Sequence, residues 1–409
     1  DDDAYLEYHN RIHAEQIDGV NFHLLEGEYA ADHYVRVSFP DRGECVKVNL
    51  IGGYSKDSKG TDISRRTPGL TVIREGRKGS SRQFYVKDWT EMTFDGIEFT
   101  GGIGDDTYGG GAIFYWPSSG SEALLTFKGC KFNKSKSNGK GGAIIQEGGS
   151  LVLDGCTFCE CTAKTTGGAI HVVKGNISTK NGTTFSQCIS EVTGGAIYVT
   201  NSTSVVDIKK TSFSENTTKE FGGAIAFYEG SMSITDGCSF TGNSATERNG
   251  IVYAGAIYVG NQGPASIDDA TFSDNKISNS FVGTDGKANT SAIGGSITIN
   301  GGKTLTVTNT TFSRSESNTG HLAMSGGAIS VRGGSKVNMT NVTIFNCSAE
   351  SEGGALHVDG VESSIKFENS TIVGNVSANG GVARLASGEA SFVNVLFDVR
   401  LMLQTRSMR

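Results

Sequence analysis

A short element, Gly-Gly-Ala-Ile, recurs along most of the chain and constrains its fold more than any other feature. Its third position is occupied in turn by Ala112, Ala143, Ala169, Ala196, Ala224, Ala256, Ser296, Ala328, Ala355 and Val382. A second marker, usually Phe, alternates with it at Phe99, Phe132, Phe158, Phe185, Phe213, Phe240, Phe272, Phe312, Ile344 and Ile372. Most steps are 26–28 residues long. One such unit cannot bury its apolar face alone, so we expect a stack of units.

Each unit contains about three short apolar runs with period-two alternation, which is typical of β-strands. In one copy these runs are residues 197–199, 204–208 and 211–214. Helical repeats are excluded because glycine, at 57 of 409 residues, opposes helices. The leucine-rich-repeat signature is absent as well. The sequence predicts an all-β fold, a right-handed parallel β-helix (solenoid) of about thirteen coils.

The chain divides into three segments. Residues 1–17 are charged and non-repetitive, and we expect them to form a short N-terminal cap. Residues 18–98 are predicted to be irregular opening coils, and residues 99–409 the regular repeats with a terminal coil. The segment 396–403 resembles a further strand with few charges, so something is expected to cover its edge.

Two side-chain files are predicted inside the solenoid. Phe132, Phe158, Phe185, Phe213 and Phe240 share one slot and should form a continuous stack. Three residues after the Phe slot stand Asn216, Asn243, Asn275 and Asn375, whose amides could hydrogen-bond from coil to coil at about 4.8 Å. In each Gly-Gly-Ala-Ile strand, the residue between Ile and Val occupies an outward-facing slot. Along the N-terminal half of the repeats this slot is partly apolar, so we expect a loop of the chain to cover it.

Composition excludes some partners. The net charge is −7 and the pI about 5.6, and no basic stripe occurs, so nucleic-acid binding has no support. No apolar run approaches the length of about 20 residues that spans a bilayer. The numbering begins at Asp1 without an initiator Met, which suggests that a targeting segment was removed.

Asn-x-Ser/Thr sequons occur at 12 of the 25 asparagines. A Ser- and Thr-rich chain forms some by accident, but the excess favours a glycosylated, secreted protein. Glycans are predicted at Asn176, Asn181, Asn201, Asn289, Asn309, Asn338 and Asn341. Asn216 and Asn375 should be unmodified because the ladder buries them.

The eight cysteines permit two interpretations. Cys130 and Cys156 occupy one slot in successive coils, as do Cys161 and Cys188, within the Cα separation of a disulfide. They are therefore disulfide candidates in an oxidising compartment. Small, reduced apolar fillers are the equally supported alternative.

The sequence shows no catalytic constellation. Glycoside hydrolysis requires two carboxylates on one face, whereas Asp105-Asp106 and Asp268-Asp269 are adjacent and point to opposite faces of a strand. His171 and His357 share a slot seven coils apart, too far to bind one metal ion. We therefore predict no catalytic residues, no metal ligands and no cofactor.

The paired motifs, such as 213–216, 240–243 and 272–275 with the Gly-Gly-Ala-Ile elements, resemble the repeats of polymorphic membrane proteins over residues 92–382. This resemblance implies a pectin-lyase-like right-handed β-helix acting as a surface adhesin.

We therefore expect a secreted, extracellular or cell-surface structural or adhesive protein. Its partner would be a second copy, docked head to tail in a filament or laterally, or a host or cell-surface protein or glycan. The alternative is a carbohydrate-active enzyme, a pectinase-like lyase or hydrolase on the same scaffold.

Overall fold

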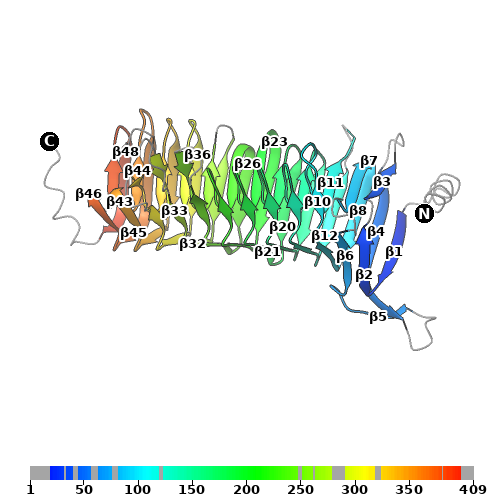
Figure 1. Cartoon of the computed structure of the whole chain (residues 1–409). Helices are drawn as coiled ribbons and strands as arrows, with labels where there is room; N and C mark the ends of the chain where they lie inside the picture. Colours follow the sequence, from blue (N-terminus) through cyan, green and yellow to red (C-terminus); the bar gives the residue numbers. More distant parts are fainter. Residues whose placement is uncertain are drawn as a thin grey trace.

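The computed structural model describes residues 19–31, 34–39, 45–56, 63–75, 82–118, 123–246, 251–260, 263–278, 291–317, 324–379 and 381–397. These residues form a parallel β-solenoid of about 11 turns without helices. Figure 1 shows the turns stacked in sequence order from the blue N-terminal end to the red C-terminal end. The predicted cap (1–17) and residue 289 lie outside the described residues.

Three columns of strands form one 35-stranded sheet that wraps around the core. Face A contains the Gly-Gly-Ala-Ile strands: β3 (Val35–Phe39), β7 (Phe84–Asp88), β11 (Ile113–Trp116), β15 (Ile144–Gln146), β19 (Ile170–Val172), the first parts of β23 (Ile197–Lys209) and β26 (Ile225–Thr235), β30 (Ile257–Val259), β35 (Ile297–Ile299), β40 (Ile329–Val331), β44 (Leu356–Val358) and β47 (Ala383–Leu385).

Face B follows face A in each turn. It contains β1 (Gly19–Leu25), β4 (Val46–Lys56), β8 (Thr90–Asp95), β12 (Leu124–Lys128), β16 (Ser150–Asp154), β20 (Asn176–Lys180), the second parts of β23 and β26, β31 (Ala265–Asp268), β36 (Thr304–Thr308), β41 (Lys336–Thr340), and the first parts of β45 (Ser364–Val373) and β48 (Glu389–Phe397).

Face C carries the Phe slot. It contains β2 (Gly27–Ala31), β6 (Thr71–Glu75), β9 (Ile97–Thr100), β13 (Lys131–Asn133), β17 (Thr157–Cys159), β21 (Thr183–Ser186), β24 (Thr211–Ser214), β27 (Cys238–Thr241), β32 (Ala270–Ser273), β37 (Thr311–Ser313), β42 (Thr343–Phe345) and the ends of β45 and β48.

A second, 13-stranded sheet closes the turn with short strands. They are β10 (Ile103–Gly104), β14 (Lys136–Ser137), β18 (Thr162–Ala163), β22 (Ile189–Ser190), β25 (Thr217–Thr218), β28 (Ser244–Thr246), β29 (Ile251–Tyr253), β33 (Lys276–Ser278), β34 (Ser291–Ile293), β38 (Glu316–Ser317), β39 (Met324–Ser325), β43 (Ser348–Glu352) and β46 (Val376–Asn379). β5 (Ile63–Arg66) pairs antiparallel with β4.

The pairing confirms the predicted parallel solenoid. Face B runs through thirteen paired strands, from β1 to β48. The turns number about 11, against the roughly thirteen coils predicted.

The Gly-Gly pair has a steric reason. Gly194 has φ of +70°, which a glycine adopts without strain. At Gly195 a Cβ would lie 1.9 Å from the carbonyl oxygen of Gly223 in the next turn. Only glycine therefore lets successive turns approach here at the strand spacing.

The predicted phenylalanine stack is confirmed. Ring centroids of Phe158, Phe185, Phe213 and Phe240 follow one another at 4.7, 4.9 and 4.8 Å, with interplanar angles of 3–9°. All these rings are fully buried. In-register parallel strands impose this spacing, so the rings stack offset along the solenoid axis.

Candidate functional site

The outward slot of face A forms one file along the solenoid. Its in-register members are Arg36, Tyr85, Phe114, Ile145, His171, Tyr198, Ala226, Tyr258, Thr298, Ser330, His357 and Arg384. Most of these side chains are buried although they point away from the core. A second row, Thr166, Thr193, Phe221 and Tyr253, joined by isolated bridges, borders them. The chain thus covers much of its own outward file, as the sequence predicted.

An aromatic cluster interrupts this cover near the N-terminal end. We call it the N-terminal aromatic cluster: Tyr34, Tyr85, Tyr108, Phe114 and Trp116. The Phe114 ring lies 4.8 Å from Tyr85, 5.5 Å from Tyr108 and 6.1 Å from Trp116. Tyr34, Tyr108 and Trp116 are 53%, 50% and 44% exposed, while Phe114 is buried beneath them. Three large rings are therefore presented to solvent by three segments: the residue before β3, the 105–110 turn and the end of β11.

Two cations fix the rings of this cluster. The guanidinium of buried Arg82 lies 5.0 Å from the Phe114 ring and donates hydrogen bonds to the carbonyl oxygens of Gly109 and Gly110. It also pairs with Asp105 at 3.2 Å. The Lys87 ammonium lies 5.2 Å from the Trp116 ring. Such contacts contribute roughly 0.5–2 kcal/mol each and pre-organise the aromatic surface.

The Asp105 carboxylate is structural. Burial raises its pKa, but hydrogen bonds from the backbone of Tyr108 and the nearby Arg82 charge outweigh burial, so its pKa lies below the ordinary value. Burial in turn lowers the pKa of Arg82. Asp105 therefore stays ionised and holds the 105–110 turn in place.

Glu147 lies one turn beyond Trp116 on the same face. Its backbone N–H donates to the Tyr115 carbonyl at 2.8 Å, which places Glu147 beside Trp116. Burial raises the Glu147 pKa, and the nearby Lys140 charge opposes that shift. Half-buried Glu147 is therefore the neighbour of exposed Trp116 in the next turn.

His171 follows in the file and is 2% exposed. Its Nδ1 hydrogen-bonds the Thr166 hydroxyl at 2.6 Å, and its Nε2 has no partner in the described part of the chain. Burial, with the charge of Lys140, lowers its pKa to about 3. The imidazole is therefore neutral at physiological pH and is shielded from solvent.

A second aromatic group, here the tyrosine cluster, occupies the middle of face A: Tyr198, Phe221, Tyr228, Tyr253 and Tyr258. The Tyr228 ring lies 5.4 Å from Tyr198 and 5.2 Å from Tyr258. Phe221 stacks on Tyr258 at 5.0 Å and on Tyr253 at 5.2 Å. Except for Tyr258, which is 5% exposed, the rings are half-buried. Tyr228 thus packs at a tilt against Tyr198 and Tyr258, whereas Phe221 stacks on Tyr253 and Tyr258.

Small residues in the neighbouring positions make this cluster possible. Ala226 takes the file position between Tyr198 and Tyr258, so its methyl group leaves room for Tyr228 to lie between them. At Gly260 a Cβ would approach both Tyr228 and Tyr258 to 3.1 Å. Burial raises the pKa of Tyr228, so its hydroxyl stays protonated.

An ion pair borders the tyrosine cluster. Arg332 donates a 2.6 Å hydrogen bond to the Tyr253 hydroxyl and lies 5.2 Å from that ring. It also pairs with Asp359 at 3.4 Å. Asp359 has a pKa below its ordinary value, since the Ser387 hydroxyl and Arg332 outweigh the effect of burial. The pair is thus balanced in charge.

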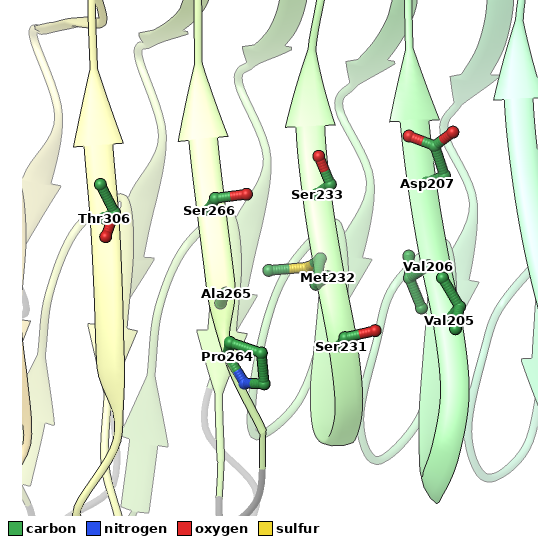
Figure 2. A pocket seen from close by; sticks show the side chains of 10 residues that line it. All are labelled: Val205, Val206, Asp207, Ser231, Met232, Ser233, Pro264, Ala265, Ser266 and Thr306. Carbon is green, nitrogen blue, oxygen red and sulfur yellow. The ribbon is translucent and has the colours of Figure 1, made fainter.

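Face B carries two shallow depressions rather than a deep cleft (Figure 2). The larger, of about 430 Å³, is lined mainly by short side chains on β23, β26, β31 and β36, including Val205, Asp207, Ser233 and Thr306. The other, of about 300 Å³, extends from Val205 and Asp207 toward β16. Asp207 pairs with Lys209 at 2.9 Å, so the floor has no isolated charge.

The structure contains an amide ladder at the predicted slot. Asn216 donates through Nδ2 to Oδ1 of Asn243 at 2.9 Å, and Asn243 donates to Asn275 at 3.0 Å. Asn375 donates to the Ile344 carbonyl and accepts from the Cys347 N–H. All four side chains are fully buried.

The asparagines predicted to carry glycans are scattered over three surfaces. Asn181, Asn309 and Asn341 lie exposed at the corner between faces B and C, with φ of 55°, 50° and 57°. Asn176 and Asn338 lie exposed on face B, and Asn201 is half-buried in the turn that precedes it. The structure does not bring them together into one site.

All eight cysteines are free thiols in the structure, as in the second of the two interpretations that the sequence left open. Cys130 and Cys156 do stack in adjacent turns, and so do Cys161 and Cys188, but the thiols contact backbone carbonyl oxygens of the preceding turn. In-register parallel strands keep Cβ atoms about 4.8 Å apart. That separation exceeds the roughly 3.5–4.5 Å that a disulfide requires.

The described part of the chain has no group of three His, Cys, Asp or Glu side chains that could hold a metal ion. Nor do its described residues include a helix with the length and apolarity to cross a membrane.

No protein-family model matches the sequence, and no curated protein matches it significantly. Among solved structures the chain is similar to a mannuronic acid-specific polysaccharide family 6 lyase from human gut microbiota, with 12% identity, a TM-score of 0.49, and 97% of this chain and 91% of that chain covered. It is also similar to the A-module of a mannuronan C-5 epimerase from Azotobacter vinelandii, with 13% identity, a TM-score of 0.40, and coverage of 95% and 93%.

Proposed function

We propose that this chain is an extracellular adhesive β-solenoid, similar in role to the passengers of polymorphic membrane proteins, that binds glycans through face A. The exposed N-terminal aromatic cluster carries the proposal. Tyr34, Tyr108 and Trp116 expose about half of their surface while remaining in ring contact through Tyr85 and Phe114. A contiguous exposed apolar patch is typical of an interaction site.

The chemistry of the rings favours a carbohydrate partner. An aromatic ring offers a flat apolar face, and tyrosine and tryptophan add a polar group at the edge. A pyranose has a complementary apolar C–H face and hydroxyl groups around it. Because strands and cation contacts hold the rings, binding costs little conformational entropy.

A glycan array probed with the purified chain tests the proposal. We expect specific glycans to bind and Trp116→Ala to weaken that binding at least tenfold, since burying a large apolar side chain is worth about 1.5–3 kcal/mol. Thr271→Ala, an exposed change on face C, is the matched control. An array without binding, or unchanged affinity in the Trp116 variant, would refute the proposed site.

A carbohydrate-active enzyme is the second candidate, and Glu147 favours it. A half-buried carboxyl with a raised pKa beside Trp116 could act as a general acid. Hydrolysis needs a second carboxylate, and the next titratable group along the file, His171, is shielded. Incubation with the polysaccharide found on the array decides between the candidates. Depolymerisation that Glu147→Gln abolishes, with binding retained, would make the protein an enzyme.

End-to-end assembly belongs to the same adhesive proposal. Among the described residues, Phe392 of the last strand, in register with buried Phe367, is 38% exposed, and Leu396, on the outward side of that strand, is 63% exposed; Val35 in β3 is 48% exposed. A second copy could add its first turn to the last strand, a contact that does not close. Electron microscopy should show filaments that Leu396→Lys shortens. Monodisperse wild-type particles would leave a monomeric adhesin.

A further inference from the structure

We propose that face C binds crystalline ice through a flat array of hydroxyl groups. This function goes beyond glycan binding and does not depend on it, since face A and face C are different sides of the solenoid. Six consecutive strands of face C, from β17 to β37, present almost only serine and threonine to solvent. None of their outward side chains is charged, although 19% of the residues of the chain are charged.

Two in-register files form this array. In each of the six strands, the residues before and after the buried phenylalanine point outward. The pairing of successive strands aligns both files without a register shift. The first file, from Thr157 to Thr311, contains only threonine and serine, and the second, from Cys159 to Ser313, contains only serine and threonine after its first member. All of them except Ser313 are at least partly exposed.

The buried ring stack keeps this face flat. Neighbouring strands of a sheet usually rotate by about 20–25° relative to one another, and flat sheets occur where side-chain stacks or ladders hold them. From Phe158 to Phe272, successive rings lie only 3–9° from parallel, with centroids 4.6–4.9 Å apart. The outward residues are direct chain neighbours of these rings, so the hydroxyl array has the same regular spacing and the same lack of twist.

Ice offers a lattice that matches this array. Across the strands the array repeats at the strand spacing, and along each strand its two files lie about 6.6 Å apart. Oxygen atoms on a prism face of hexagonal ice form a rectangular lattice. Its short repeat differs from the strand spacing by a few tenths of an ångström, and its long repeat is slightly larger than the separation of the two files. A hydroxyl group donates one hydrogen bond and accepts two, so it can replace a water molecule at a lattice point.

Some neighbouring hydroxyl groups bond to each other. Ser239 donates to Ser212 at 3.0 Å, and the hydroxyl oxygens of Thr241 and Ser273 lie 3.1 Å apart. Their Cβ atoms are still held at the strand spacing, and rotation about χ1 between staggered rotamers restores that spacing to the oxygens. Each bonded hydroxyl also keeps further bonding capacity toward water. These pairs therefore leave the array able to bind a lattice.

The lack of charge on this face favours the same ligand. A group such as an ammonium is strongly hydrated, and its water shell does not fit an ice lattice. Charged residues border the array instead: Glu160 pairs with Lys134 at 3.8 Å and Asp274 with Arg314 at 2.7 Å, at the corner that follows face C. Toward the N-terminus the array begins at β17, because Lys131 of β13 occupies the first file. Many weak contacts on a rigid lattice add up only when all of them are in register.

Ice growth in a solution of the full chain tests the proposal. We expect thermal hysteresis, a gap between the melting and freezing temperatures of a single ice crystal, and uptake of the labelled chain into a slowly grown ice hemisphere. Thr241→Tyr places a large ring in the middle of the array and should remove both signals. Thr271→Tyr repeats this test in the other file. Thr306→Tyr, an equally exposed change on face B, is the matched control and should retain both signals.

Tyrosine suits an exposed strand, and far-UV circular dichroism with urea denaturation checks that all three variants fold. A wild-type chain without thermal hysteresis and without uptake into ice would overturn the proposal. Equal losses in Thr306→Tyr and in the face C variants would overturn the assignment to face C. Trp116→Ala should leave ice binding unchanged and Thr241→Tyr should leave glycan binding unchanged, so each function can fail without the other.

Discussion

Replacing Asn243 by alanine tests the internal amide ladder. The side chain makes four hydrogen bonds inside a fully buried slot. Its Oδ1 accepts from the backbone N–H and from Nδ2 of Asn216, at 3.1 and 2.9 Å. Its Nδ2 donates to the Phe213 carbonyl and to Oδ1 of Asn275, both at 3.0 Å. Alanine removes all four bonds and adds none.

The expected loss of stability follows from the groups left behind. The Asn216 backbone N–H loses its acceptor in the dry interior, which costs about 1–3 kcal/mol. Asn216 Nδ2 keeps the Phe185 carbonyl, and Asn275 Oδ1 keeps the Asn243 N–H, so the other three bonds contribute roughly 0.5–1.5 kcal/mol each. We therefore expect the free energy of unfolding to fall by about 2.5–7.5 kcal/mol in total.

Urea denaturation measures this loss, and hydrogen exchange locates it. In a solenoid each turn contacts only its neighbours, so exchange should accelerate first around residues 213–246 and less toward the ends. Thr271→Ala on the surface should stay within about 0.5 kcal/mol of the parent. A loss below about 1 kcal/mol for Asn243→Ala, or acceleration spread evenly along the chain, would contradict the ladder as a source of stability.

Three further predictions follow from the same structure. Phe213→Ala should reduce the free energy of unfolding by about 3–5 kcal/mol, measured in urea, because it opens a cavity in a fully buried stack. The free energy of unfolding should fall as pH drops from 6.5 toward 4. Burial lowers the pKa of His171 to about 3 and that of His357 to about 4, so the unfolded chain takes up protons that the folded chain does not. His171→Ile should reduce this dependence on pH, and an unchanged dependence would refute the prediction. Peptide mapping after secretion from a eukaryotic host should find glycans on exposed Asn181 and none on buried Asn216. The reverse occupancy would refute the assignment of Asn181 to the surface and Asn216 to the interior.

The sequence was sufficient for the fold because the repeat has steric causes. The Gly-Gly pair must be glycine wherever neighbouring backbones approach within van der Waals contact, as at Gly195. The Phe slot must recur in register because each ring, such as Phe213, stacks on its copies one strand spacing away. Both constraints act on every turn, so they appear as periodicity. The opening turns lack these markers, so their strands are less evident from the sequence.

Part of the excess of Asn-x-Ser/Thr sequons has a structural explanation that could not be recognised from the sequence. Asn181, Asn309, Asn341 and Asn369 occupy one corner with positive φ, a conformation that asparagine tolerates better than most residues. Neighbours in this corner also bond, as Asn341 donates to Oδ1 of Asn309 at 3.2 Å. Face C begins two residues later, where a β-branched threonine suits a strand. These four sequons therefore have a cause in turn geometry, so the total number of sequons does not by itself indicate glycosylation.

The candidate site was less predictable, because it depends on side chains that pack outside the in-register outward slot. The outward slot alone gives Tyr198, Ala226 and Tyr258, which suggests a gap in the aromatic surface. The gap is filled by Tyr228, two residues further along the chain, whose ring lies between the two tyrosines. A period-two pattern assigns a residue to one face of the sheet, but it does not predict which neighbouring side chain the ring packs against. The small residues Ala226 and Gly260 are the sequence features that mark this position, since each leaves space that a larger side chain would take from Tyr228. An aromatic surface on a β-solenoid should therefore be sought where the outward slot holds small residues, as well as where it holds aromatic ones.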